Sequence, residues 1–213
     1  MSNESSLSSV KDEQLVAKRR AQMIQGALKL FKEKGFHRTT TREIAKASGF
    51  SIGTLYEYIR TKEDVLYFVC ESIYEQVHER LEEAIDFENA SVSHLAAVVS
   101  SYFHLVDQMQ EEILIMYQEA KSLSKETKSY VLQKERDMVA MLERVMIACL
   151  PEDMPKRDVS LIANNIFIQG QMWGFRRWML HNQFTLEAYI DRQIHYLFKS
   201  LGLEEEEASN LTG

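Results

Sequence analysis

The chain has 213 residues, of which 45% are hydrophobic, enough to bury one compact core or two small ones. No stretch approaches the roughly 20 consecutive apolar residues of a membrane span, and the N-terminus lacks the basic-then-apolar order of a signal peptide. We therefore expect a cytoplasmic protein with no membrane partner. The formal net charge of -7 by itself argues against a nucleic-acid partner, but this average conceals a division along the chain.

The charge is divided between a basic segment near the N-terminus and an acidic remainder. Ala17 to Leu66 contains 11 Lys and Arg against 5 Asp and Glu, a local charge of +6. Tyr67 to Gly213 contains 13 against 24, or -11, and the first sixteen residues contribute the remaining -2. An acidic body with one basic end suits a DNA-binding module, because neutralising phosphates and releasing their counterions supplies much of the affinity.

The first predicted element is a helix that ends at Gly35. In the stretch RRAQMIQGALKLFKEKG, Ile24, Ala27, Leu28 and Phe31 line one face, and the glycine supplies a backbone conformation in which helices commonly end.

Two further helices separated by a tight turn follow within residues 40–62. Thr40 and Glu43 have the spacing of a capping box, so a short helix begins at Thr41. Gly49 marks its exit, and Ser51 caps a second helix of about two turns, SIGTLYEYI. This pattern predicts a helix-turn-helix whose second helix is the recognition helix; the alternative is a generic helical hairpin.

A long connecting helix begins at another capping box, formed by Thr61 and Asp64. It is predicted over residues 62–85, with a line of apolar residues at helical spacing. A rigid helix of this length connects the two parts of the chain and can transmit a change between them.

The spacing of these residues resembles the N-terminal domain of TetR-family transcriptional repressors from about Lys18 to Leu66. Phe50 stands where a smaller aliphatic residue is common in that family, and Ile59 where phenylalanine is common. The residues that carry the resemblance are Thr40, Ile44, Ala45, Gly49, Phe50, Ser51, Gly53, Tyr56, Tyr58, Lys62 and Glu63.

The resemblance implies an all-α protein, in which a three-helix helix-turn-helix domain is joined by a long helix to a helical ligand-binding and dimerisation domain. Few prolines and glycines and no alternating strand pattern agree with it. The predicted boundaries are a flexible N-terminal arm at 1–16, the DNA-binding domain at 17–66, the ligand-binding and dimerisation domain at 67–201 and an acidic tail at 202–213. The expected partners are a palindromic double-stranded DNA operator and a second copy of the chain.

The candidate DNA-binding residues fall into groups with different roles. Residues at the leading end of the recognition helix are expected to meet base edges: Ser51, Ile52, Thr54 and Leu55. Gly53 lets the backbone approach the duplex. Phosphate contacts are expected from Thr40, Tyr56, Tyr58 and Lys62, with further backbone or minor-groove contacts from Arg42, Lys18, Arg19 and Arg20.

The body is predicted to contain five more helices, near residues 92–106, 109–121, 125–149, 157–181 and 186–201. Ser91, Ser124 and Thr185 are the caps that separate them, together with the segment from Pro151 to Pro155.

A homodimer interface is predicted on the last two helices because the helix at 157–181 carries more large apolar residues than one core-facing stripe needs. The alternative is that this surface is buried inside one subunit. The candidate interface residues are Gly170, Trp173, Gly174, Trp178, Ile190, Ile194 and Leu197.

A small hydrophobic effector is expected to bind among the preceding helices, although aromatic and methionine side chains at helical spacing are also typical of an ordinary core. The candidates are Tyr102, Phe103, Val106, Ile113, Met116, Tyr117, Met138 and Met141. The run MYQEAKSLSKETKSYVLQKERDMVAMLERV, with WGFRRW downstream, is similar to sensor domains of TetR-family repressors of fatty-acid and steroid degradation, which respond to coenzyme A thioesters. The resemblance implies an acyl-CoA effector, for which Lys121, Arg176 and Arg177 could bind the headgroup; ordinary surface charge is the alternative.

Three other functions are alternatives to this one. A TetR-type regulator of an efflux pump that responds to hydrophobic drugs is the alternative within the family. A di-iron helical-bundle enzyme would need Glu-x-x-His on two helices, and only Glu75 to His78 has this spacing. A protein-interaction module would use the helix-turn-helix for packing only. Without a phosphate loop, zinc spacing or nucleophile elbow, we expect no enzyme, catalytic residue, cofactor or metal site.

Overall fold

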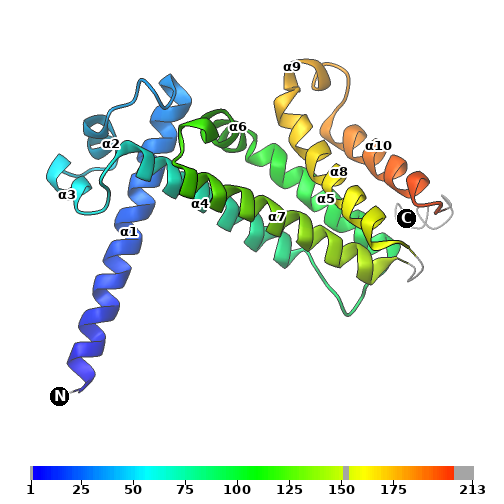
Figure 1. Ribbon diagram of the computed structural model, residues 1–213, viewed down its shortest axis with the longest axis horizontal. Helices are drawn as coiled ribbons and strands as arrows, with labels where there is room; N and C mark the ends of the chain where they lie inside the picture. The colour runs from blue at the N-terminus through cyan, green and yellow to red at the C-terminus, as the bar shows by residue number, and fades with distance from the viewer. Residues whose placement is uncertain (1, 151–153, 204–213) are drawn as a thin grey trace. The chain divides into compact units, whose positions relative to one another are not determined.

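The computed structural model describes residues 2–150 and 154–203, and the side chains of residues 13–150 and 154–203. All regular elements of these residues are helices, which confirms the predicted all-α class (Figure 1). The described chain forms two compact units. The first contains the residues up to Ile73 together with Ile115–Ser129, and the second contains Tyr74–Leu114 and the residues from Tyr130 onward. None of the described helices is both long and apolar enough to span a bilayer.

The first unit contains a helix-turn-helix. Helix α2 lies beside α1, and α3 lies beside α2 (Figure 1). Buried side chains from all four helices form its core, among them Phe31, Ile44, Leu55 and Leu66. The helices are α1 (Ser2–Lys34), α2 (Thr41–Ala47), α3 (Ile52–Tyr56) and α4 (Lys62–Glu83), the last of which continues into the second unit.

The local signals that predicted these helices are present as hydrogen bonds. The Thr40 hydroxyl accepts from the Glu43 N–H at 3.3 Å, while the Glu43 carboxylate accepts from the Thr40 N–H at 2.9 Å. Ser51 caps α3 by accepting from the Thr54 N–H at 3.0 Å. Gly49 has a φ of 77°, a conformation that favours glycine, so the turn between α2 and α3 forms where the sequence predicted it.

The recognition helix is shorter than predicted. The pattern SIGTLYEYI suggested about two turns, but α3 ends at Tyr56. The chain then bends so that Ile59 is buried, and the Asp64 carboxylate accepts from the Arg60 and Thr61 N–H groups at 2.8 Å each. Burial of Ile59 in the core therefore stabilises the bend more than the helical sequence pattern stabilises a longer helix.

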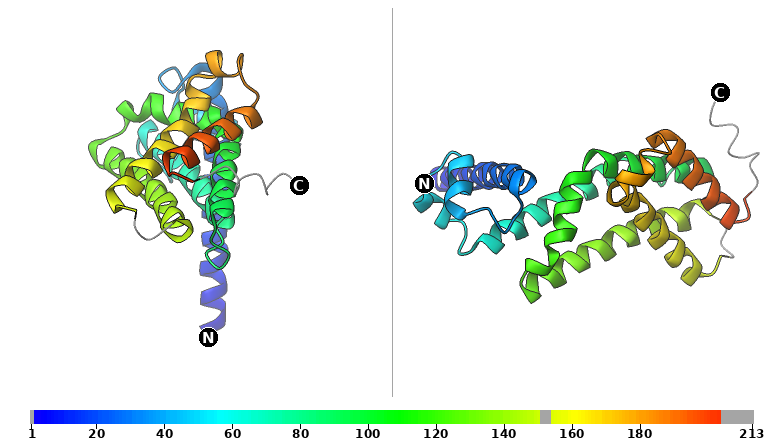
Figure 2. Two further views of the ribbon diagram at one scale, coloured as in Figure 1. Left: turned by 90° about the vertical axis from the view of Figure 1, so that its right-hand side faces the viewer. Right: turned by 90° about the horizontal axis from the view of Figure 1, so that it is seen from above.

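The second unit is built around α5, α8 and α10, which lie side by side (Figure 2). Its aromatic side chains pack together: Tyr102 stacks on Phe167 with ring centroids 5.7 Å apart, and its hydroxyl donates to the Phe167 carbonyl at 2.9 Å. The remaining elements are α5 (Val92–Gln108), α6 (Gln110–Glu119), the 3-10 helix η1 (Ala120–Ser122), α7 (Lys125–Cys149), α8 (Lys156–Phe175), α9 (Arg177–Leu180) and α10 (Leu186–Ser200).

One predicted helix of the body is broken. Residues 157–181 form α8 and the short α9, because Arg176 leaves the helical conformation with φ -108° and ψ 22°. The turn that follows α9 places the His181 ring 4.0 Å from the Trp173 ring, measured between centroids. The break therefore lets the chain fold back over Trp173.

The predicted ends of the chain also differ from the structure. Residues 2–16, predicted as a flexible arm, continue α1, and no proline or glycine separates them from the helix that follows. Of the predicted acidic tail, residues 204–213 lie outside the described residues.

Helix α1 packs closely against the end of α2 at Gly26. A Cβ at this position would lie 2.7 Å from Ser48 Oγ and 3.0 and 3.1 Å from backbone atoms of Ser48 and Ala47. Since two of these neighbours are backbone atoms, α2 would have to move away from α1.

We predict that Gly26→Ala lowers the free energy of unfolding by about 1–3 kcal/mol, the usual cost of overpacking, despite the better helix propensity of alanine. Thermal unfolding followed by circular dichroism measures it. Gly53→Ala is the matched control, because its Cβ would meet only Ser51 Oγ, at 3.6 Å. Equal stability of the Gly26 variant and the wild type would show that the two helices can separate freely.

Candidate nucleic-acid interface

The N-terminal end of α3 presents short side chains to solvent. Ile52 is 36% exposed, Ser51 and Gly53 are exposed, and Thr54 is half-buried with its hydroxyl 3.0 Å from that of Ser51. Leu55 was predicted to contact base edges, but its side chain is completely buried. It is therefore a core residue and does not contact bases. The residues next to it in sequence can still face DNA, because consecutive residues of a helix point in different directions.

Tyr56 is held by a residue that the sequence analysis missed. Its hydroxyl lies 3.2 Å from that of Thr41, the first residue of α2, while its side chain remains 52% exposed. The pair fixes the end of α3 against the start of α2. The role of Thr41 could not be predicted from the sequence, because Tyr56 lies fifteen residues away and is brought next to it only by the turn between α2 and α3.

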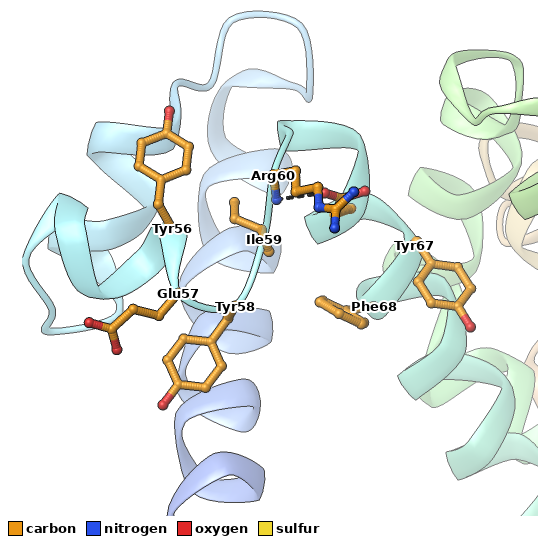
Figure 3. A pocket seen from close by; sticks show the side chains of 8 residues that line it. Tyr56, Glu57, Tyr58, Ile59, Arg60, Tyr67 and Phe68 are labelled. Atoms are coloured by element: carbon orange, nitrogen blue, oxygen red, sulfur yellow. Dashed lines mark hydrogen bonds between the residues drawn. The ribbon is translucent and has the colours of Figure 1, made fainter.

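A groove of about 460 Å³ lies beside the turn between α3 and α4 (Figure 3). The rings of Tyr56 and Tyr58 point away from each other on the two sides of this turn, and Phe68 comes from α4 (Figure 3). The groove is lined by Tyr56, Glu57, Tyr58, Ile59, Arg60, Asp64, Tyr67 and Phe68. It places aromatic and charged groups next to the recognition helix.

Thr40 and Glu43 form a charged network with α1. Lys34 Nζ lies 2.5 Å from Glu43 Oε1, and the Thr40 hydroxyl donates to Glu43 Oε2 at 2.8 Å. The hydrogen bonds from Lys34 and then from Thr40 lower the pKa of the Glu43 carboxyl to about 2. The Thr40 hydroxyl, predicted to contact a phosphate, thus already has a role in the cap.

Lys62 is engaged inside the first unit. Its ammonium donates to the Phe36 carbonyl at 2.9 Å and the His37 carbonyl at 3.3 Å, and it lies 4.2 Å from the centroid of the Phe36 ring. These contacts hold the start of α4 against the loop between α1 and α2. Its predicted phosphate contact would have to compete with them or use the one remaining N–H.

The other predicted cations differ in their surroundings. Arg42 is exposed on α2, and Lys18 is exposed on α1. Arg19 and Arg20 are half-buried on α1, where Arg20 pairs with Glu71.

The loop after α1 also meets the segment 115–129. His37 Nε2 lies 3.3 Å from Glu119 Oε2, and Ser122 Oγ lies 3.5 Å from the same imidazole nitrogen. This contact explains why Ile115–Ser129, which the sequence analysis assigned to the body, belongs to the first unit.

The predicted effector-binding residues are divided between the units. Six of them are buried in the second unit: Tyr102, Phe103, Val106, Ile113, Met138 and Met141. In the first unit Met116 is buried, Tyr117 is half-buried and Lys121 is exposed. Arg176 and Arg177, in the second unit, are exposed.

Most of the predicted interface residues face the inside of their own unit. Trp173 is 3% exposed and donates from Nε1 to Asp107 at 2.6 Å, while a Cβ on Gly170 would lie 2.5 Å from Tyr102 Cε1. Gly174 approaches Gln110 in the same way. Ile190 and Leu197 are also buried, whereas Ile194 is half-buried and Trp178 is 67% exposed.

Groups of three or more His, Cys, Asp or Glu side chains that could hold a metal ion do not occur within residues 13–150 and 154–203.

A capped two-helix unit with exposed short side chains on its second helix defines a helix-turn-helix DNA-binding regulator. The family described as "Bacterial regulatory proteins, tetR family" matches residues 23–67, the segment that contains α2 and α3. Over this segment the chain is similar to TetR-family transcriptional regulators, which agrees with the resemblance predicted from the sequence.

Relatives extend the similarity beyond the helix-turn-helix. The transcriptional regulator HbdR of Aromatoleum sp. (strain CIB) is 28% identical over 191 residues, which cover 89% of this chain and 83% of HbdR. The transcriptional repressor KstR2 of Mycobacterium tuberculosis (strain ATCC 25618 / H37Rv) is 24% identical over 76% of this chain and 82% of its own length. The fatty acid metabolism regulator protein of Bacillus subtilis (strain 168) is 35% identical over 40% of this chain and 44% of its own.

Solved structures share the fold. A TetR-family regulatory protein from Rhodococcus RHA1 has a TM-score of 0.72 at 22% identity, covering 87% of this chain and 98% of that one. AibR, solved with isovaleryl coenzyme A and operator DNA, has a TM-score of 0.66 at 21% identity, covering 84% and 98%.

We predict that Glu43→Gln lowers the thermal stability of the protein at pH 5 and above. The folded-state pKa of about 2 lies below the ordinary 4.5, so the carboxylate stabilises the fold above pH 4.5 and loses this effect as the pH falls toward 2. The difference in melting temperature between wild type and variant should therefore shrink between pH 5 and pH 2.5. Glu57→Gln is the control, and a constant difference across this range would contradict the assignment.

Proposed function

We propose that this protein is a homodimeric repressor that binds a palindromic operator through α2 and α3 and is released from it by a long-chain acyl-CoA. The recognition surface carries the DNA-binding part of the proposal. The bases are contacted by Ser51, Ile52, Gly53 and Thr54. Phosphates on either side of the DNA major groove are contacted by Tyr56 and Arg42. The local charge of the segment around them, +6, favours the same partner.

The dimer interface is proposed on the outer surface of the last helices. Four large side chains remain exposed there: Leu161 (60%), Ile168 (43%), Trp178 (67%) and Tyr196 (55%). Leu161 and Ile168 are two turns apart on α8 and share a face. Several large apolar side chains left in water on neighbouring elements favour a protein partner. The buried Trp173 and Ile190 then support this surface from within.

The effector is proposed to enter the second unit among α5, α6 and α7. Phe103, Met138 and Met141 offer an apolar and adaptable lining for an acyl chain. The exposed Arg176 and Arg177 supply cations for the phosphates of coenzyme A. The similarity to a fatty acid metabolism regulator supports this class of effector, as does the isovaleryl coenzyme A bound by AibR.

We predict that Ile168→Glu converts the dimer to a monomer in sedimentation equilibrium and abolishes binding to the palindrome, because the interface would bury an unpaired charge. The helical circular dichroism spectrum should not change, since Ile168 is 43% exposed in the single chain. Ile147→Glu, on the exposed surface of α7, is the matched control and should remain dimeric. An Ile168 variant that stays dimeric would place the interface on another surface.

We predict that long-chain acyl-CoA weakens binding to a labelled operator, selected by the wild-type protein from a random palindromic pool, by at least tenfold. Such a change needs about 1.4 kcal/mol of coupling, and the operator must weaken acyl-CoA binding by the same factor. Acyl-CoAs of several lengths, free fatty acids and coenzyme A are titrated in parallel.

The arginine pair provides the control for the headgroup. Arg176→Ala/Arg177→Ala should keep the affinity for DNA but need more acyl-CoA for release, whereas Arg157→Ala, on the exposed start of α8, should behave as wild type. Release by fatty acid and acyl-CoA alike would reject the headgroup site. Release by none of them would reject the acyl-CoA effector and leave the repressor in place.

A further inference from the structure

Two consecutive arginines of α1 stack on aromatic rings of the first unit, Phe50 in the turn before α3 and Phe68 in α4. The Arg19 guanidinium carbon lies 5.1 Å from the centroid of the Phe50 ring, and that of Arg20 lies 4.3 Å from the centroid of the Phe68 ring. Both side chains are half-buried, so stacking rather than free solvation determines where the two charges lie.

The two arginines differ in how their charge is balanced. Arg20 forms an ion pair with Glu71, whose side chain is 16% exposed. Arg19 has neither an ion pair nor a hydrogen bond to any of the side chains described, residues 13–150 and 154–203. A guanidinium that stacks through its face keeps its in-plane N–H donors available. The Arg19 charge is thus placed by the fold but not neutralised by it.

The position of Phe50 gives this charge a functional meaning. Phe50 directly precedes Ser51, the N-cap of α3, and therefore lies next to the end of the recognition helix that carries Ile52 and Gly53. Recognition helices enter the major groove with their N-terminal residues, and the phosphates of the duplex border that groove. A cation held beside this end lies where a phosphate must pass.

We propose that Phe50 is a positioning residue that holds the Arg19 guanidinium beside the N-terminal end of α3 for contact with a DNA phosphate. Arg20, in contrast, is a structural residue that joins α1 to α4 through Glu71. This assignment rests on the DNA-binding function of the protein. It gives Phe50 a role that packing alone does not require, because an aliphatic side chain would fill the same position without attracting a cation.

The test measures the affinity for a palindromic duplex, selected by the wild-type protein from a random-sequence pool, at several salt concentrations. Arg19→Ala should weaken binding about three- to tenfold and lower the log–log salt slope by about 1.8, the effect of two lost phosphate contacts, one from each protomer of the dimer. Phe50→Leu should weaken binding about two- to fivefold, the loss of one cation–π contact, and Phe50→Tyr should restore it.

The double variant separates positioning from packing. If Phe50 acts through Arg19, Phe50→Leu/Arg19→Ala binds as Arg19→Ala alone does, so the two effects are not additive. Arg20→Ala/Glu71→Gln removes the neighbouring pair without changing the net charge, and it should lower the melting temperature while leaving the salt slope as in the wild type.

Additive effects, or a wild-type salt slope in Arg19→Ala, would overturn the proposal. If Phe50→Leu loses helical structure, two other measurements test the proposal. These are the salt slope of Arg19→Ala and the DNA affinity of Phe50→Tyr. Absence of any duplex binding by the wild type would instead reject the DNA-binding function itself, so the two failures can be told apart.

Discussion

The recognition helix depends on the burial of Leu55. A helix of five residues is far below the length at which helices persist in water, so α3 holds its shape only because the surrounding unit fixes both of its ends and one face. Ser51 caps its start, the Thr41–Tyr56 pair fixes its end, and the fully buried Leu55 attaches its inner face to the core. The exposed residues that we propose to contact DNA are therefore oriented by Leu55, a buried residue that does not contact DNA itself.

The local structure of this protein could be predicted because its signals lie within four residues of one another. The capping boxes at Thr40 and Thr61, the caps at Ser51 and Thr185 and the turn at Gly49 are all found where the sequence placed them. At each cap a side chain competes with water for a few backbone groups, and at Gly49 the turn depends on a backbone conformation that favours glycine, so residues distant in sequence have little influence on either.

The roles of particular side chains could not be predicted as well, because they depend on partners distant in sequence. Lys62 has the composition and position of a phosphate ligand, yet its ammonium reaches two carbonyls twenty-five and twenty-six residues earlier. Gly170 and Gly174 show the same ambiguity. Two small residues one turn apart allow close approach of any helix, and periodicity does not distinguish a helix of the same subunit from one of its partner; here they face Tyr102 and Gln110 of the same chain.

Because three helices run through both units, the proposed effector can act on the helix-turn-helix only in certain ways. The boundary between the two units falls inside α4, α6 and α7 and not in loops, since Ile73 and Tyr74, Leu114 and Ile115, and Ser129 and Tyr130 are each consecutive residues of one helix. A sharp kink at such a point would disrupt backbone hydrogen bonds of the helix, whereas gentle curvature would not. The proposed effector site in the second unit therefore uses helices, α6 and α7, that also supply residues to the first unit, where Glu119 meets His37 in the loop before α2. Because a shift of about 1.4 kcal/mol between two helix positions already changes DNA affinity tenfold, small differential contacts with the effector are sufficient.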